Sequence, residues 1–94
     1  MEEKNRQLLA KTAIHINCFS LALCNRIAFR PTKQDATMLI KNMELSDSLD
    51  EYIRPYMNED ELKMYKIILS TLNMELNLLE KDIERVLIGE ENER

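Results

Sequence analysis

The chain has a single glycine, two prolines and no tryptophan in its 94 residues, and histidine occurs once. So little glycine and proline, together with abundant Leu, Ile, Met, Glu and Lys, is typical of a nearly all-helical protein. The same shortages remove much of what an active site is built from, and the sequence shows no convincing nucleophile–base pair and no nucleotide-binding motif. We therefore predict a protein that is not an enzyme, with no catalytic residue and no cofactor.

Cysteine occurs only twice, at Cys18 and Cys24, inside the most apolar part of the chain. Six residues apart on a helix, the two side chains point about 120° away from each other, which is too divergent for a disulfide within that helix. We expect both to be small buried hydrophobic residues in a reducing compartment. His15 and Cys18 could share a helix face, as metal ligands do, but no further ligands stand at a suitable spacing, and we predict no metal site.

A long hydrophobic run is also missing. The most apolar stretch, residues 13–24, falls short of the ~20 residues that span a bilayer, and it is interrupted by His15 and Asn17. Glu2 and Glu3 stand where a signal peptide would be basic. We predict a soluble, unprocessed, cytoplasmic protein with no membrane contact.

The length predicts one domain over residues 1–94. Its first helix is expected at about residues 2–29, because the residue before Pro31 avoids helical geometry. From Ile14 to Cys24 this helix is apolar almost all round. Such a pattern predicts a helix that is buried on most sides.

The middle of the chain is expected to form two short helices. Thr32 is a suitable N-cap for the first, at about residues 33–44. The apolar positions then change phase, and Ser48 with Glu51 three residues later makes a capping-box pattern. A second short helix is therefore expected at about residues 47–54, which gives a middle rod that is broken.

The last helix is expected at about residues 59–88. Asn58 and Glu61 form another capping pattern at its start, and Gly89 is the expected cap residue at its end, ahead of a frayed tail at residues 90–94. Two long helices and a broken middle rod of similar length make an all-α, up-down-up helical bundle.

This last helix carries two apolar stripes on roughly opposite sides. The first repeats at alternating steps of three and four residues, as in a coiled coil. Its members are Leu62, Tyr65, Leu69, Leu72, Leu76, Leu79, Ile83 and Val86. We assign this longer heptad stripe to the core, so the other stripe faces outward and predicts a protein-binding, dimer-forming surface of Met64, Ile67, Met74 and Leu78. The swapped assignment, with the heptad stripe forming the dimer, remains an alternative.

Basic residues gather around the first turn of the chain, at Arg26, Arg30 and Lys33. They could bind an anion near the N-terminus of the second helix, where backbone N–H groups point outward. They could equally pair with the acidic end of the last helix. The sequence does not decide between anion binding and internal ion pairing for this cluster.

These patterns favour a small interaction protein, acting as a regulator, adaptor or chaperone. A chain of this size buries little more than about 60% of its unfolded surface, so partner surface can contribute to its stability. We predict a homodimer that binds a further protein partner.

The alternative is a DNA-binding regulator that uses the short helix pair, residues 33–54, as a helix-turn-helix. Its second helix carries Asp47, Asp50 and Glu51 against Arg54, and the whole chain has a net charge of −4. Because that charge repels phosphate, nucleic acid is the less favoured partner.

Overall fold

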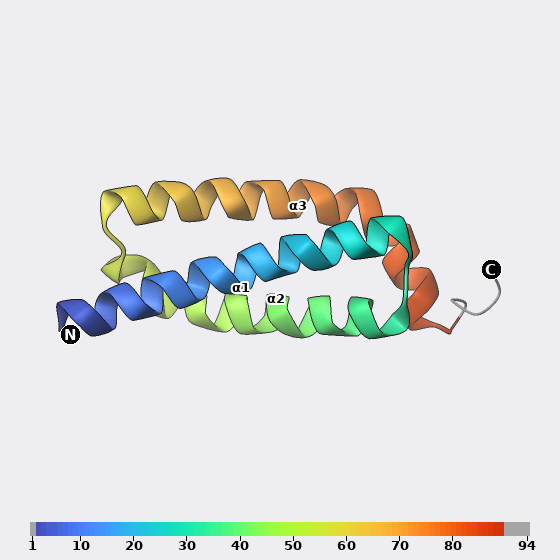
Figure 1. Ribbon diagram of the computed structural model, residues 1–94, viewed down its shortest axis with the longest axis horizontal. Helices are drawn as coiled ribbons and strands as arrows, with labels where there is room; N and C mark the ends of the chain where they lie inside the picture. The colour runs from blue at the N-terminus through green and yellow to red at the C-terminus, as the bar shows by residue number, and fades with distance from the viewer. Residues whose placement is uncertain (1, 90–94) are drawn as a thin grey trace.

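Three α-helices make up almost all of residues 2–89, the part of the chain that the computed structural model describes. They are α1 (Glu3–Phe29), α2 (Lys33–Ile53) and α3 (Glu59–Leu87), with a short 3-10 helix, η1 (Arg54–Tyr56), after α2. α1 and α3 run in the same direction and α2 runs against them (Figure 1). No strand occurs among the described residues, so the predicted all-α bundle with two long helices at about 2–29 and 59–88 is confirmed. The tail predicted at 90–94 lies outside the described residues.

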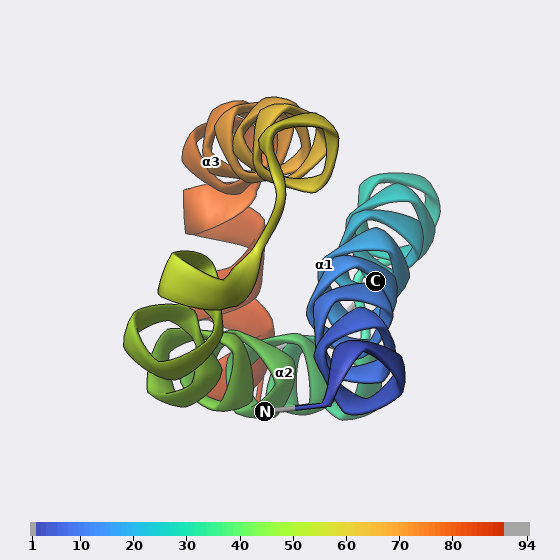
Figure 2. The same ribbon diagram turned by 90° about the vertical axis from the view of Figure 1, so that its left-hand side faces the viewer.

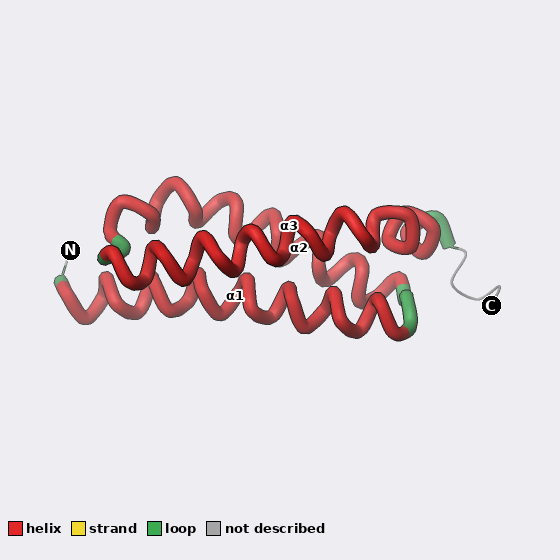
Figure 3. Tube along the Cα trace, turned by 90° about the horizontal axis from the view of Figure 1, so that it is seen from above, coloured by secondary structure: helices red, strands yellow, loops and turns green. Residues whose placement is uncertain are grey.

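The helix ends follow local hydrogen-bond chemistry. The Thr32 side chain accepts a hydrogen bond from the backbone N–H of Asp35, which caps α2. At the start of α3, the Asn58 side chain accepts from the Glu61 N–H and the Glu61 carboxylate accepts from the Asn58 N–H, so the predicted capping box is confirmed. The connecting segments lie at the ends of the bundle (Figure 3).

The predicted break in the middle rod is wrong, because α2 is continuous from Lys33 to Ile53. Ser48 does not cap a helix of its own; its Oγ donates to the carbonyl oxygen of Glu44, 3.0 Å away, inside α2. The change of apolar phase has another cause. Leu39, Ser46 and Ile53 are all buried and stand one heptad apart, so the buried seam runs through a polar residue that hydrophobic periodicity does not count.

Ser46 is tolerated in the core because it is hydrogen-bonded. Its Oγ donates to Oδ1 of Asn17, 3.0 Å away, and Nδ2 of Asn17 donates to the carbonyl oxygen of Ala13 at 2.9 Å. Asn17 is 1% exposed and Ser46 is 6% exposed. A buried polar group that loses its partner is costly, so this pair fixes how α2 sits against α1.

α1 contacts both other helices more extensively than those two contact each other. Seen along the bundle, α3 lies above α2 and α1 lies beside both of them (Figure 2). The prediction that α1 is buried on most sides from Ile14 to Cys24 is nevertheless wrong, because Cys18 and Phe19 in this stretch are exposed. Two neighbouring helices cover only part of a helix circumference, whatever its composition.

The inward side of α3 is the heptad stripe. Every second member of it is buried, namely Tyr65, Leu72, Leu79 and Val86, and the others are partly buried against the same core. Leu72, Leu79 and Val86 belong to a large apolar cluster with Leu23 and Leu39, whereas Tyr65 packs in a second cluster with Ala13 and Ile53.

Polar side chains tie the helices together at the end where α3 begins. Nη1 of Arg6 donates to the carbonyl oxygen of Tyr56, 2.9 Å away, and to the Glu61 carboxylate. The hydrogen bonds from Arg6 lower the pKa of Glu61 below its usual value. This contact holds the first turns of α1 against the connection between η1 and α3.

The buried Tyr65 is anchored at the same end. Its hydroxyl donates to Oδ1 of Asp50 at 2.8 Å, and Arg54 both pairs with Asp50 and lies over the Tyr65 ring. Burial, reinforced by the neighbouring Asp50, raises the pKa of Tyr65 to about 12. Hydrogen bonds from Arg54, then from Tyr65, lower the pKa of Asp50 despite its partial burial.

We expect Ser46→Ala and Ser48→Ala, two substitutions in one helix, to behave differently. Ser46→Ala leaves Oδ1 of the buried Asn17 without its donor and should lower the free energy of unfolding by about 1–3 kcal/mol. Ser48→Ala removes only an exposed bond to the helix backbone and should change stability by less than about 0.5 kcal/mol. Chemical denaturation measures both free energies of unfolding. A larger loss for Ser48→Ala would indicate that Ser48 caps a separate short helix and that α2 is not continuous.

Alkaline pH should destabilise the protein through Tyr65. An unfolded tyrosine ionises above pH ~10, so between pH 10 and about 12 the unfolded state binds fewer protons than the folded state and stability falls. The loss attributable to Tyr65 should reach about 2–3 kcal/mol by pH 12 and should be absent in Tyr65→Phe. The exposed Tyr52→Phe is the control and should follow the wild type; parallel pH curves for wild type and Tyr65→Phe would contradict the assignment.

Candidate functional site

The outward stripe of α3 is exposed as predicted. Met64 is 55% exposed, Ile67 60%, Met74 65% and Leu78 77%. The heptad stripe therefore faces the core of the chain and the second stripe faces solvent, whereas the choice of stripe for a dimer contact stays a prediction. Binding of a protein by this stripe stays a prediction.

Thr71 lies in the middle of the stripe and does not interrupt its apolar character. Its Oγ1 donates to the carbonyl oxygen of Ile67, 3.0 Å away, so the hydroxyl is already satisfied within α3. The stripe ends where Lys81 and Arg85 occupy the same side of the helix, and Arg85 pairs there with Asp82. A contiguous apolar patch bounded by charge is the usual form of a protein contact site.

A second surface, the α2–α3 groove, was not predicted. It is a hollow of about 360 Å³ between the two helices. Its apolar lining consists of Leu39, Ile40, Met43, Leu76, Ile83 and Leu87, and Glu80 and Glu84 also line it. A smaller adjoining hollow shares Met43 and Leu76 and adds Asp47. Ile40 and Met43 are only partly covered, because α2 and α3 make few contacts with each other.

The three members of the predicted anion-binding cluster do not converge on one point. Nε of Arg26 donates to Oδ2 of Asp35 at 3.1 Å, so the internal partner is in the first turn of α2 and not at the acidic end of the last helix. Arg30 lines the same shallow hollow. An anion here would meet the Asp35 carboxylate, and anion binding by Arg26, Arg30 and Lys33 stays a prediction without added support.

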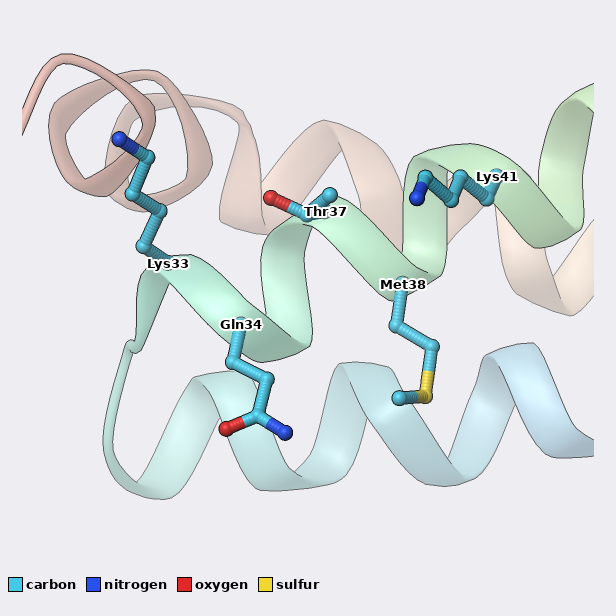
Figure 4. A pocket seen from close by; sticks show the side chains of 5 residues that line it. All are labelled: Lys33, Gln34, Thr37, Met38 and Lys41. Carbon is cyan, nitrogen blue, oxygen red and sulfur yellow. The ribbon is translucent and has the colours of Figure 1, made fainter.

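Lys33 lines a different hollow, of about 480 Å³, on the surface of α2. Lys33, Thr37 and Lys41 lie along one side of the helix there, while Gln34 and Met38 point toward α1 (Figure 4). The two lysines are two helical turns apart, about 12 Å along the axis, and their ends point in different directions (Figure 4). They therefore do not form a compact anion pocket.

Reactive groups are few among residues 2–89. No three His, Cys, Asp or Glu side chains come together in a way that could hold a metal ion there. Cys18 is exposed, contrary to the prediction, whereas Cys24 is buried as predicted. Burial, together with the nearby charge of Glu75, raises the pKa of Cys24 to about 11.

Residues 33–54 do not form the helix-turn-helix that the DNA-binding alternative requires. Residues 33–53 are one helix, followed directly by η1, so no turn separates a first helix from a recognition helix. DNA binding by a helix pair at 33–54 consequently loses the geometry on which that hypothesis depended.

Comparison of the chain with protein-family models, curated proteins and solved structures finds no match. The length and composition of α1 would also suit a membrane-spanning helix, a test that a core helix of a soluble protein passes as well. A cytoplasmic location without membrane contact stays a prediction. The two apolar surfaces, the outward stripe of α3 and the α2–α3 groove, are therefore the features of the molecule that bear on its function.

The two cysteines should differ sharply toward a thiol reagent at pH 8. A pKa of about 11 in place of 9.0 lowers the thiolate fraction of Cys24 about 100-fold, and burial slows its reaction further. We expect one thiol per native chain to react quickly and the second only on unfolding. Cys18→Ser should remove the fast phase and Cys24→Ser should keep it; two fast thiols in the native protein would show that α1 is not packed as described.

Proposed function

We propose that this protein is a small non-enzymatic interaction module that acts as a homodimer, joined through the outward stripe of α3, and works as a regulator, adaptor or chaperone for another protein. The observation that carries the proposal is the exposure of four large apolar side chains along one side of one helix. Burying each of them would stabilise a complex by roughly 1.5–3 kcal/mol at best. Leaving them in water is the less favourable state.

The order of residues along the stripe suits two-fold symmetry. Met64 and Leu78 lie seven residues on either side of Thr71, and Ile67 and Met74 lie four and three residues from it. When two such helices pair in antiparallel fashion about Thr71, Met64 of each chain meets Leu78 of the other. A self-complementary patch of this kind produces a closed dimer, the commonest oligomer symmetry.

Charge supports the same arrangement. The first turn of α3 is acidic and includes the exposed Asp60, whereas Lys81 lies near the other end of the helix. Antiparallel pairing about Thr71 brings Lys81 of one chain close to Asp60 of the other. A parallel pairing would instead place like charges together, at a cost in affinity.

The dimer is tested with Ile67→Glu combined with Met74→Glu. Because carboxylates would have to be buried in place of apolar side chains, the dissociation constant should rise more than about 100-fold, giving a folded monomer by light scattering and circular dichroism. Lys66→Glu combined with Asn73→Glu is the matched control, with the same spacing on α3 but about 100° around the helix from Ile67 and Met74, and should remain dimeric.

Two results would contradict the proposal. A wild-type protein that stays monomeric at high concentration would remove the homodimer altogether. A double variant, Ile67→Glu with Met74→Glu, that remains dimeric would place the interface elsewhere on the molecule.

A further inference from the structure

The α2–α3 groove is an open side of the bundle. α1 packs against both partners, but α2 and α3 contact each other much less, and the space between them is hollowed over several helical turns. The apolar side chains at its base, including Ile40, Leu76 and Ile83, are only partly covered. The groove is thus a concave apolar surface within a well-packed protein.

The dimensions of this groove suit one α-helix. Its α3 wall extends from Leu69 to Leu87 and its α2 wall from Leu39 to Asp47, so the two walls face each other over about 12 Å at ~1.5 Å per residue. A helix laid in it would contact both walls over about two turns, as the fourth member of a four-helix bundle. Recognition of an amphipathic helix by an apolar groove between helices is a general mode of protein binding.

The charge of the lining points to one class of helix. Asp47, Glu80 and Glu84 are exposed carboxylates on the walls, on both α2 and α3. No Lys, Arg or His occurs among the described residues that line the groove. A docked helix with acidic flanks would be repelled, and one with Lys or Arg on either side of its apolar stripe would be attracted.

We propose that the α2–α3 groove binds a basic amphipathic helix of another protein. The apolar stripe of that helix contacts Met43, Leu76 and Ile83, and its flanking cations face Asp47, Glu80 and Glu84. This inference names a partner class for the interaction module proposed above and depends on that function. It uses a separate surface: Leu76 and Met74 point about 160° apart on α3, so groove and outward stripe can be occupied together.

Two synthetic peptides test the groove. Both are 18-residue helices with leucine at the same positions of one stripe; one has lysine and the other has glutamate on the flanks. Binding is measured by fluorescence anisotropy of labelled peptide at several salt concentrations. The wild-type protein should bind the lysine peptide at least about tenfold more tightly than the glutamate peptide, and added salt should reduce the difference.

Charge reversal within the protein locates the contact. Glu80→Lys combined with Glu84→Lys should weaken binding of the lysine peptide roughly tenfold and strengthen binding of the glutamate peptide. Glu2→Lys combined with Glu59→Lys makes the same change of net charge at the far end of the bundle and should leave both affinities within about twofold. Circular dichroism confirms that each variant is folded.

The outcomes that overturn the inference are distinct. Equal affinity for the two peptides, or equal effects of the groove variant and the control variant, would show that no specific groove contact exists. A change of oligomeric state in Glu80→Lys with Glu84→Lys would identify a second copy of this chain as the occupant instead. Peptide binding that persists in Ile67→Glu with Met74→Glu would support the groove as a binding site even if the outward stripe proved not to be a dimer interface.

Discussion

The inward face of α1 consists mainly of small side chains, and most of the fold follows from it. Ala10, Asn17 and Cys24 recur at one heptad spacing, with Ala13 and Ser20 between them, and all are buried. Small residues let a helix backbone approach its neighbours closely, so larger side chains from α2 and α3, such as Leu39, Leu72 and Tyr65, fill the remaining space. Because α1 packs against both neighbours, α2 and α3 are separated along much of their length, and the groove lies in the space between them.

Polar groups control the geometry of this arrangement at two levels. Ser46 and Asn17 make the register of α2 against α1 specific, since a slip along the seam would leave buried hydrogen-bonding groups unpaired. At the end of the bundle, Arg6 and Asp50 hold the η1 segment to its neighbours through carboxylate, carbonyl and phenol contacts. The apolar clusters supply the stabilising burial, and the polar contacts select one arrangement of it.

The sequence predicted α3 well because its pattern is strong and internal to one helix. The heptad stripe from Leu62 to Val86 is long enough to be placed inward, and exposure of Met64 and Leu78 then followed from helix geometry alone. The break in α2 was predicted wrongly because Ser46, a buried member of the seam, is polar. Burial of Cys18 was predicted wrongly because composition does not reveal how many neighbours a helix has. The groove depends on the distance between α2 and α3, which no local pattern encodes.

The described residues form three long helices that alternate in direction, which places the start of α1 and the end of α3 at opposite ends of a body 51 Å long (Figure 1). A force applied through those two ends runs along the helix axes, so it loads the contacts between α1 and its neighbours in shear. Under shear, side chains along the whole seam resist together, whereas helices peeled from one end separate one turn at a time. Because α1 and α3 run parallel, a pull between these two ends acts along the seams of α1 and not across them.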